Sequence, residues 1–401
     1  MTALDLSMLT TACAPGGASV LTSITELVPA AGAFAGIAPA RYLRGRNATY
    51  AYEDRFDGEK PVKVVLIDSK GSQANRVEAA IAMCIRDGHP ELSLTPRIEL
   101  QYDGKEPVTD LELPHRAWDG HVRAGTRDGK PLVHDPDYVA ARNSTHADAR
   151  ALLELSAASV GFGSWDASRA KDQVRFRSPL VGEIIGILAD PHAPEPLRGG
   201  ARVDPISAGV RLAPDDIEAI LAGQEEELST STVKEIRKAI DAARKKKTTI
   251  SAAALGLGHI PPSLGTLGLV SCRKIVRHHV LSFAALRQLR FGLGHDGDAA
   301  ARALVAAWVL TGLAYSDAEL CLRANCDLRE AGPSRVVLDG RYGEETVLEP
   351  LTPDAMSRLL GEAIEAAVAA GLRWEGQVLH VVGDPSIIAG ASADEDSSGQ
   401  A

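Results

Sequence analysis

A cluster of polar side chains stands where a predicted strand passes into a predicted helix. Residues 61–68 (PVKVVLID) form the apolar run of a buried strand, and Ser72 can cap a helix that ends near Arg86. Hydroxyl, amide and guanidinium groups donate hydrogen bonds to phosphate and ribose, and the free N–H groups of a helix N-terminus favour an anion. The plainer alternative is that Ser72 only caps the helix and that Arg76 is solvated. The sequence predicts a phosphate-binding corner made of Ser69, Ser72, Gln73, Asn75 and Arg76.

Further basic side chains occur in groups that could contact the same polyanion. Arg175 and Arg177 are two residues apart, so on a strand both would point to the same side. A predicted helix over residues 232–247 ends in basic residues, which also suit the helix dipole. For every group the alternative is a solvated or salt-bridged surface, and for Trp165 a core position is more typical than a stacking platform. The remaining candidates are Arg41, Arg44, His115, Arg116, Arg169, Lys171, Lys245, Lys246, Lys247, Arg273 and Arg277.

The composition limits the classes of function. The chain has 401 residues, of which 45% are hydrophobic and 24% charged, so it is not disordered throughout. The formal charge of -10 argues against a protein that simply coats a polyanion. That charge is unevenly distributed: residues 234–290 contain twelve Lys or Arg and two Asp or Glu, whereas residues 300–401 contain seven and sixteen. This asymmetry indicates a polyanion-facing surface on an otherwise acidic chain.

Motifs for catalysis, metal binding and membrane insertion are weak. The glycines at 292, 294 and 297 match GxGxxG, but a basic predicted helix precedes them where a dinucleotide site requires a strand. The apolar stretch over 299–315 is short for a membrane span and contains Arg302. The five cysteines are scattered and lack zinc-ligand spacing, as is typical of reduced thiols in a cytoplasm. We therefore expect a cytoplasmic protein without a metal, a cofactor or a membrane contact.

Strand and helix patterns alternate along the chain and predict an α+β protein. Helices are expected over 72–86, 215–223, 232–247, 273–291 and 298–313, and from residue 352 onward. Strands are expected over 19–28, 61–68, 98–102 and 377–382, with a hairpin over 336–348. The Gly- and Pro-rich residues 255–268 are expected to form a loop.

Several segments resemble one protein family, and they occur in the family's order. Residues 66–78 (LIDSKGSQANRVE) resemble the LIDS-x-x-SQANR-x-E signature of the backbone subunit of type I-G (formerly I-U) CRISPR Cascade complexes. Two positions depart from the family pattern: Ala167 replaces a Ser and His259 replaces an Asn. The other similar segments are LPHRA at 113–117 with Asp119, FGSWDA at 162–167, EIIG at 183–186, GLGHIPP at 256–262, LSFAALRQLRF at 281–291 and LRANCDL at 322–328.

The resemblance implies a fold and a role. The family has a modified RRM (ferredoxin-like) core with inserted helical thumb and finger elements. Applied to this chain, it implies a core over 1–210 and 273–388 and a charged helical insertion over 211–272. The Gly-, Ser-, Ala- and Asp-rich composition at the end of the sequence predicts a disordered tail over 389–401. It implies a protein that polymerises with its own copies along CRISPR RNA, joins other Cascade subunits, and meets target DNA through the guide. Cleavage in such systems belongs to a separate helicase-nuclease.

Two functions from different classes follow. The first is a non-catalytic scaffold that holds the guide backbone without reading its bases, because base pairing reads the sequence. The second is an RNA endonuclease of the same superfamily, for which His115 and Asp119 are the candidate acid and base.

Overall fold

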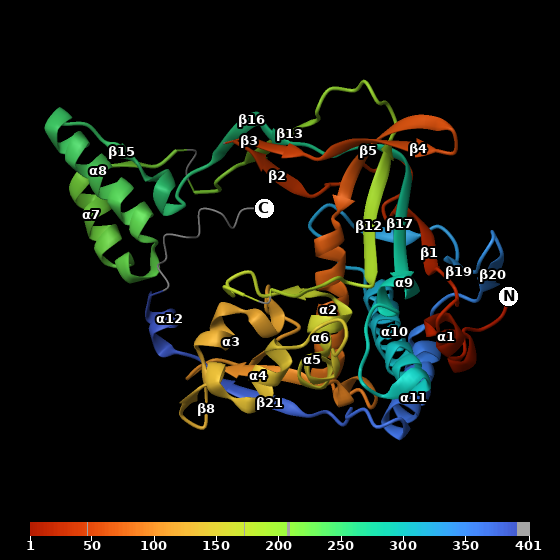
Figure 1. The fold of residues 1–401 in the computed structure, drawn as a ribbon. Coiled ribbons are helices and arrows are strands. Elements are labelled where there is room, and N and C mark those ends of the chain that lie inside the picture. The colour runs from red at the N-terminus through yellow and green to blue at the C-terminus, as the bar shows by residue number, and fades with distance from the viewer. Residues whose placement is uncertain (46, 172, 207–208, 391–401) are drawn as a thin grey trace. The chain divides into compact units, whose positions relative to one another are not determined.

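The computed structural model describes residues 1–45, 47–171, 173–206 and 209–390, and the side chains of residues 265 and 266 are not part of that description (Figure 1). The chain forms two compact units. Unit 1 comprises Met1–Ala40, Tyr52–Pro191 and Ser271–Ile388, and unit 2 comprises Arg41–Ala51, His192–Val270 and the described residues after 388. The tail over 389–401 that the sequence predicts as disordered lies outside the described residues from position 391 onward.

Unit 1 is built on an eight-stranded antiparallel sheet. Its strands lie in the order β20-β19-β1-β17-β12-β5-β4, and β18 pairs with the end of β1. The strands β12 and β17 are neighbours, although the whole of residues 192–270 separates them in the sequence. The bounds are β1 (Val20–Pro29), β4 (Tyr52–Asp57), β5 (Lys60–Asp68), β12 (Leu180–Leu188), β17 (Cys272–Ser282), β18 (Leu328–Glu330), β19 (Arg335–Asp339) and β20 (Glu345–Leu348).

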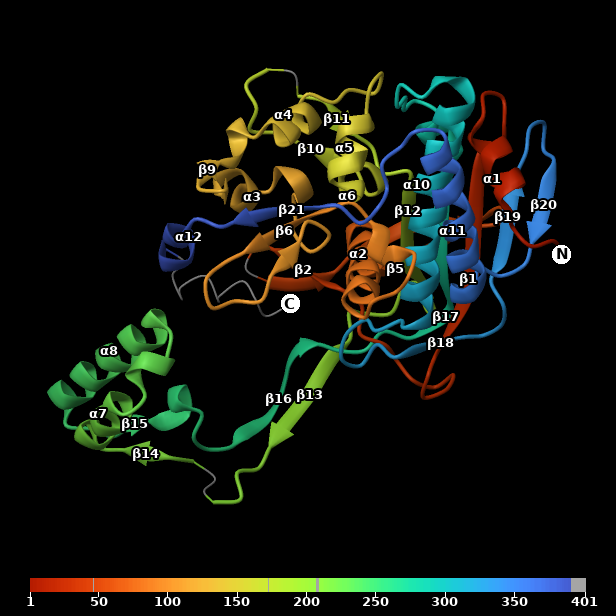
Figure 2. The same ribbon diagram turned by 90° about the horizontal axis from the view of Figure 1, so that it is seen from below.

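Helices cover one face of this sheet. Along β1, Leu21 and Leu27 are buried, whereas Ile24 on the opposite face is exposed, which is the alternation of a sheet with one covered side. Helix α10 (Gly294–Ala318) lies at the centre of the covering layer, with α2 (Lys70–Arg86) and α11 (Pro353–Ala369) on either side of it (Figure 2). The helix α1 (Leu6–Cys13) packs on α10 as well.

The close packing of α10 explains its composition. At Gly312 a Cβ atom would lie 2.6 Å from Ile81 of α2, so only a glycine allows this approach. The helix is long and apolar enough to cross a membrane, but 89% of its most apolar window is buried inside the protein. Both observations identify α10 as a core helix.

A smaller five-stranded sheet completes unit 1. Its strands lie in the order β7-β6-β21-β8-β9, and β6 and β21 are parallel. Trp308 of α10 contacts Phe162 and Trp374 edge-on, so one core joins the helical layer to this part of the unit. The bounds are β6 (Arg97–Gln101), β7 (Val108–Thr109), β8 (Thr126–Arg127), β9 (Lys130–Pro131), β21 (Val378–Val382), α3 (Gly120–Ala124), α4 (Pro136–Arg142), α5 (Arg150–Leu155), α6 (Ala157–Gly161), α9 (Phe283–Leu286) and α12 (Pro385–Gly390).

Unit 2 contains two-stranded ribbons and a helical pair. In the helical pair, Ile217 and Leu221 of one helix pack against Val233, Ile236 and Ile240 of the other. The bounds are β2 (Arg41–Arg44), β3 (Asn47–Tyr50), β13 (Leu197–Arg202), β14 (Arg211–Leu212), β15 (Ile250–Ser251), β16 (Ile260–Leu267), α7 (Pro214–Ala222) and α8 (Thr230–Lys246).

Two predicted elements are wrong. Residues 273–291 were expected to be a basic helix, but they form β17 followed by the short α9. The β-branched residues of KIVRHHV and the burial of every second side chain explain the strand, since period two rather than 3.6 places Ile275, Arg277 and His279 toward the helices. The Gly- and Pro-rich residues 260–267, expected to be loop, pair with β13 as strand β16.

The protonation of His279 should make stability depend on pH. Burial lowers the pKa of this imidazole to about 3, and both ring nitrogens lack a hydrogen-bond partner within the described structure. As the pH falls from 6.5 toward 3, the unfolded chain takes up a proton that the folded chain does not, so stability is lost over this window at up to about 1.4 kcal/mol per pH unit. We expect His279→Leu to keep the stability at pH 7 and to flatten this loss. Urea unfolding at pH 7, 6, 5 and 4 measures it, and equal slopes for the two proteins would contradict the assignment.

Candidate nucleic-acid interface

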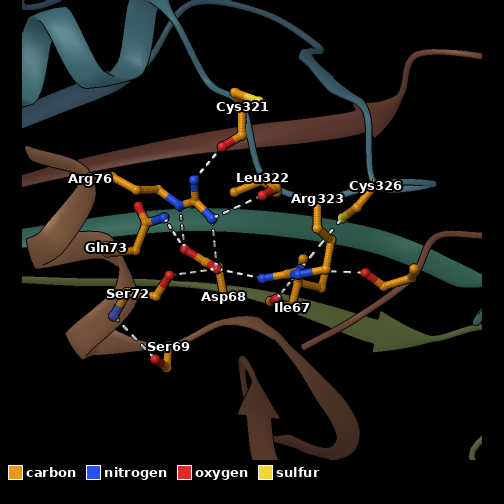
Figure 3. A network of polar contacts seen from close by, with 11 residues as sticks. Ile67, Asp68, Ser69, Ser72, Gln73, Arg76, Cys321, Leu322, Arg323 and Cys326 are labelled. Atoms are coloured by element: carbon orange, nitrogen blue, oxygen red, sulfur yellow. Dashed lines mark hydrogen bonds and ion pairs between the residues drawn. The ribbon is translucent and has the colours of Figure 1, made fainter. Parts of the chain in front are cut away.

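The side chain of Asp68 is the centre of a buried polar network, which we call the Asp68 hub (Figure 3). Asp68 ends β5 and is fully buried. Its carboxylate accepts hydrogen bonds from Gln73 Nε2 at 2.6 Å, Arg76 Nε at 2.9 Å, Ser72 Oγ at 3.0 Å and Arg323 Nη2 at 2.6 Å. Burial alone would raise the pKa of Asp68, but the bonds from Arg76 and Gln73 outweigh it and hold the pKa below its ordinary value. Asp68 is therefore an ionised carboxylate whose hydrogen bonds all come from groups of the protein.

The two arginines of the hub connect distant segments. Arg76 also donates to the backbone carbonyls of Cys321 and of Leu322, and Arg323 donates to the carbonyl of Ile67 at 2.7 Å. The hub thereby fixes the segment 321–327 against the start of α2. Two sequence motifs that are far apart in the chain, at 66–78 and at 322–328, meet in this one network.

The predicted phosphate-binding corner is therefore mostly internal. Gln73 is only 3% exposed, and Arg76 directs its donors at Asp68 and at backbone carbonyls, so neither is free to bind a ligand in this conformation. Ser69 caps α2 by accepting a hydrogen bond from the backbone N–H of Ser72 at 3.2 Å, so Ser69 and not the predicted Ser72 is the capping residue. Asn75 is exposed. The binding role of Gln73 and Arg76 stays a prediction, because in this structure their donors are taken by the buried carboxylate of Asp68, one residue before Ser69.

Arg116 has a similar structural position. Its guanidinium holds the buried Glu78 of α2 in a bidentate pair, with Nε–Oε1 at 2.5 Å and Nη2–Oε2 at 2.8 Å, and donates through Nη1 to the carbonyl of Gly163 at 3.0 Å. This side chain connects α2 to the start of the hairpin of β10 (Ser164–Trp165) and β11 (Arg175–Phe176). In this structure Arg116 therefore links these elements, and its role in ligand binding stays a prediction. The neighbouring His115 is exposed.

Arg277 is buried as well. Its Nη2 lies 2.7 Å from Glu330 and 3.1 Å from Asp317, in the covered face of the main sheet. Burial raises the pKa of Asp317 to about 7. Arg273, at the start of the same strand, is exposed and pairs with Asp57 at 3.3 Å. Arg277 is thus excluded as a surface contact because period two turns it inward, which the helical prediction for this segment concealed.

The hairpin of β10 and β11 presents an aromatic and a cation to solvent. Trp165 and Arg175 are directly opposite each other in the two strands, and the guanidinium carbon of Arg175 lies 4.1 Å from the centre of the indole ring. Trp165 is 44% exposed, so the core position favoured from the sequence is wrong. Arg177 and Lys171 are exposed nearby in the chain, whereas Arg169 is partly buried and donates to the carbonyl of Arg142 and to Asn143 Oδ1, both at 2.6 Å.

The remaining predicted cations are on the surface of unit 2. Arg41 and Arg44 are exposed on β2, and the lysines 245–247 are exposed at the end of α8. The neighbouring Arg244 is paired with Asp215 at 2.6 Å, as a salt-bridged surface would be. In the part of the chain that the structure describes, no ion pair is formed by Arg41, Arg44, Lys171, Arg175, Arg177, Lys245, Lys246 and Lys247.

The side chains of His115 and Asp119 are not arranged as an acid and a base that act together. Asp119 is buried and caps α3: its Oδ1 accepts from the backbone N–H of His121 at 3.0 Å, and its Oδ2 from the backbone N–H of His115 at 3.3 Å. Among the described residues, no three His, Cys, Asp or Glu side chains are grouped as ligands for a metal ion.

An ionic cluster that the sequence did not predict lies on the face of the main sheet opposite the helices. Glu183 of β12 lies 3.3 Å from His278 Nε2 and 3.1 Å from Arg55 Nη1. The hydrogen bond from His278 is the main cause that lowers the pKa of Glu183 to about 2, and Arg55 adds to it. The alternation within KIVRHHV, once assigned to a strand, is the sequence signal that would have placed His278 on this face.

Part of the chain is similar to a known protein family. Residues 21–191, from β1 to the end of β12, match the sequence profile of the family described as CRISPR-associated protein GSU0053. The match contains the Asp68 hub residues of α2, Arg116 and the β10–β11 hairpin, and no curated protein matches the chain. Over these residues the chain is therefore similar to a family of CRISPR-associated proteins.

Proposed function

We propose that this protein is the non-catalytic subunit that binds CRISPR RNA in a type I-G Cascade complex. In this role it polymerises along the guide with other copies of itself, contacts other Cascade subunits, and presents the guide to invading DNA in the cytoplasm. A separate helicase-nuclease would cut the DNA. The family match over 21–191 carries this proposal.

The topology of unit 1 supports an RRM-like core. The elements β1, α2, β12, β17, α10 and β19 follow one another as β-α-β-β-α-β, the order of ferredoxin-like folds, with β5 added before α2. The four strands among them are contiguous in the sheet as β19-β1-β17-β12. Unit 2 then interrupts the connection between β12 and β17, in the manner of an inserted thumb.

The surface charge supports a backbone-binding role. The predicted cations that are exposed and form no ion pair within the described residues are lysines and arginines. Such side chains bind phosphates through their charge and have no preference for a particular base. Two other predicted cations, Arg116 and Arg277, point inward and pair with carboxylates of the protein. The endonuclease alternative is weaker, because the carboxylate of Asp119 is occupied by two backbone N–H groups.

RNA binding should be steeply dependent on salt and on RNA length. We expect single-stranded RNA to bind regardless of sequence, and Lys171→Ala with Arg177→Ala to reduce the slope of log affinity against log salt by between about 1 and 1.5. Filter binding or fluorescence anisotropy from 50 to 400 mM salt measures it.

The matched control removes the same charge from the acidic segment over residues 300–401. Arg329 and Arg358 are exposed in β18 and α11, and their replacement by Ala should leave the slope unchanged. Equal effects of the two double variants would show a nonspecific charge effect and contradict the proposed site. Absence of RNA binding, or cleavage of the RNA that depends on His115, would overturn the proposed function.

A further inference from the structure

The tryptophan of the β10–β11 hairpin differs from the other three in the chain. Trp118, Trp308 and Trp374 are buried, whereas Trp165 is largely accessible. One face of its ring carries the Arg175 guanidinium at 4.1 Å. An exposed indole stacked with arginine is a flat, polarisable and cationic surface.

The neighbours of Trp165 hold this hairpin in place from the inside. Phe176, which follows Arg175, is buried against His146 with ring centres 5.2 Å apart. Gly163 adopts a φ of +80°, and a Cβ there would lie 2.7 Å from the carbonyl oxygen of Phe176, so the two strands approach as only glycine permits. Arg116 fixes the carbonyl of Gly163 to α2. The alternate residues thus point inward, and Trp165 and Arg175 are held outward on a rigid support.

The local charge selects the chemistry of the ligand. Asp166, the carboxylate beside Trp165, is buried and neutralised by Arg142 at 2.6 Å, with a second bond at 2.8 Å. Arg177 and Lys171 are exposed, and neither forms an ion pair with any residue that the structure describes. A stacking surface that carries one cation, has two more exposed cations nearby in the chain and has its carboxylate neutralised fits an unpaired nucleobase with its flanking phosphates better than an apolar protein segment.

We propose that Trp165 and Arg175 form a stacking platform for one unpaired base of the bound RNA, and that Arg177 and Lys171 contact the phosphates on either side of that base. This inference rests on the proposed function and goes beyond it, because backbone binding alone needs no aromatic. Stacking is indifferent to base identity, so the platform would fix the position of a nucleotide along the guide without reading it.

Tryptophan fluorescence tests this directly, since Trp165 is the accessible tryptophan of the described chain. Titration with a single-stranded RNA should quench and shift the emission, and Trp165→Phe should remove most of the change while retaining most of the affinity. Trp165→Ala should weaken binding by about 5- to 100-fold. An oligonucleotide of the same length with abasic sugars throughout should bind more weakly and leave the emission of the wild-type protein unchanged.

The other outcomes are distinguishable. RNA binding of wild-type affinity by Trp165→Ala, or quenching that persists in Trp165→Phe, would overturn the platform and leave the proposed function standing. Equal quenching by the abasic oligonucleotide would overturn it too, since phosphates would then suffice. A change in self-association measured by sedimentation, without a change in RNA affinity, would assign Trp165 to a protein contact and likewise refute the inference. No RNA binding by the wild-type protein would refute both proposals.

Discussion

Replacing Asp68 by alanine should lower the free energy of unfolding by about 3–5 kcal/mol, because it leaves Arg76 and Arg323 without their buried counter-charge. Gln73 would also lose the acceptor of its amide while remaining buried. The segment 321–327 should then loosen from α2, since both arginines position it. Urea unfolding at pH 7 measures the loss, and hydrogen exchange of residues 321–327 locates it.

Two variants sharpen this result. Asp68→Asn keeps the size and one acceptor oxygen but removes the charge, so its cost should be intermediate. Asp54→Ala removes an exposed aspartate of β4 whose pair with Lys63 is 3.5 Å long, and its effect should stay below about 1 kcal/mol. If Asp68→Ala were as mild as Asp54→Ala, the hub would not hold the chain together as described.

Among substitutions that add one methyl group to the main sheet, Gly182→Ala should lower the free energy of unfolding most. Gly182 and His279 are opposite each other in β12 and β17, and a Cβ at 182 would lie 1.9 Å from the imidazole carbon Cδ2. Since the ring is buried between the strand and the helical layer, the sheet must distort, at a cost of about 3 kcal/mol. Thermal or urea unfolding measures it.

The partner substitution provides the control for this clash. Combining Gly182→Ala with His279→Ala should recover part of the stability, because the shortened side chain makes room for the new methyl group. Gly71→Ala, in the first turn of α2 where nothing lies within 4 Å of the added Cβ, should be neutral or stabilising. A double variant no more stable than Gly182→Ala would show that the clash is not with His279.

The sequence predicted the strongly periodic elements well. The strands at 20–29 and 60–68, the helices α2, α8, α10 and α11, and the β19–β20 hairpin all occur close to their predicted places. These segments have one dominant period or a clear cap, so local pattern and tertiary structure agree. The segment that became β17 shows the limit: its lysines and arginines suggested a basic helix, whereas pairing with β1 and β12 decided for a strand.

The candidate site was less predictable, because residue types do not say which partner they face. Gln73, Arg76 and Arg116 have the donors of an RNA-binding surface, yet each donates to a buried carboxylate of the protein itself. Only the tertiary structure brings Asp68 to Arg323 across the chain. Trp165 illustrates the opposite error: a rare aromatic suggests a core, and its exposure depends on a hairpin whose inward positions are already filled by its neighbours.

The long excursion between β12 and β17 has a consequence for how the fold tolerates change. These adjacent strands are joined only through residues 189–271, so their register is set by packing in unit 1 and not by a turn. The entropy of closing such a loop grows only with the logarithm of its length, by about 0.6 kcal/mol for each doubling. A change in the length of the connection over 189–271 should therefore cost the sheet of unit 1 little thermodynamic stability.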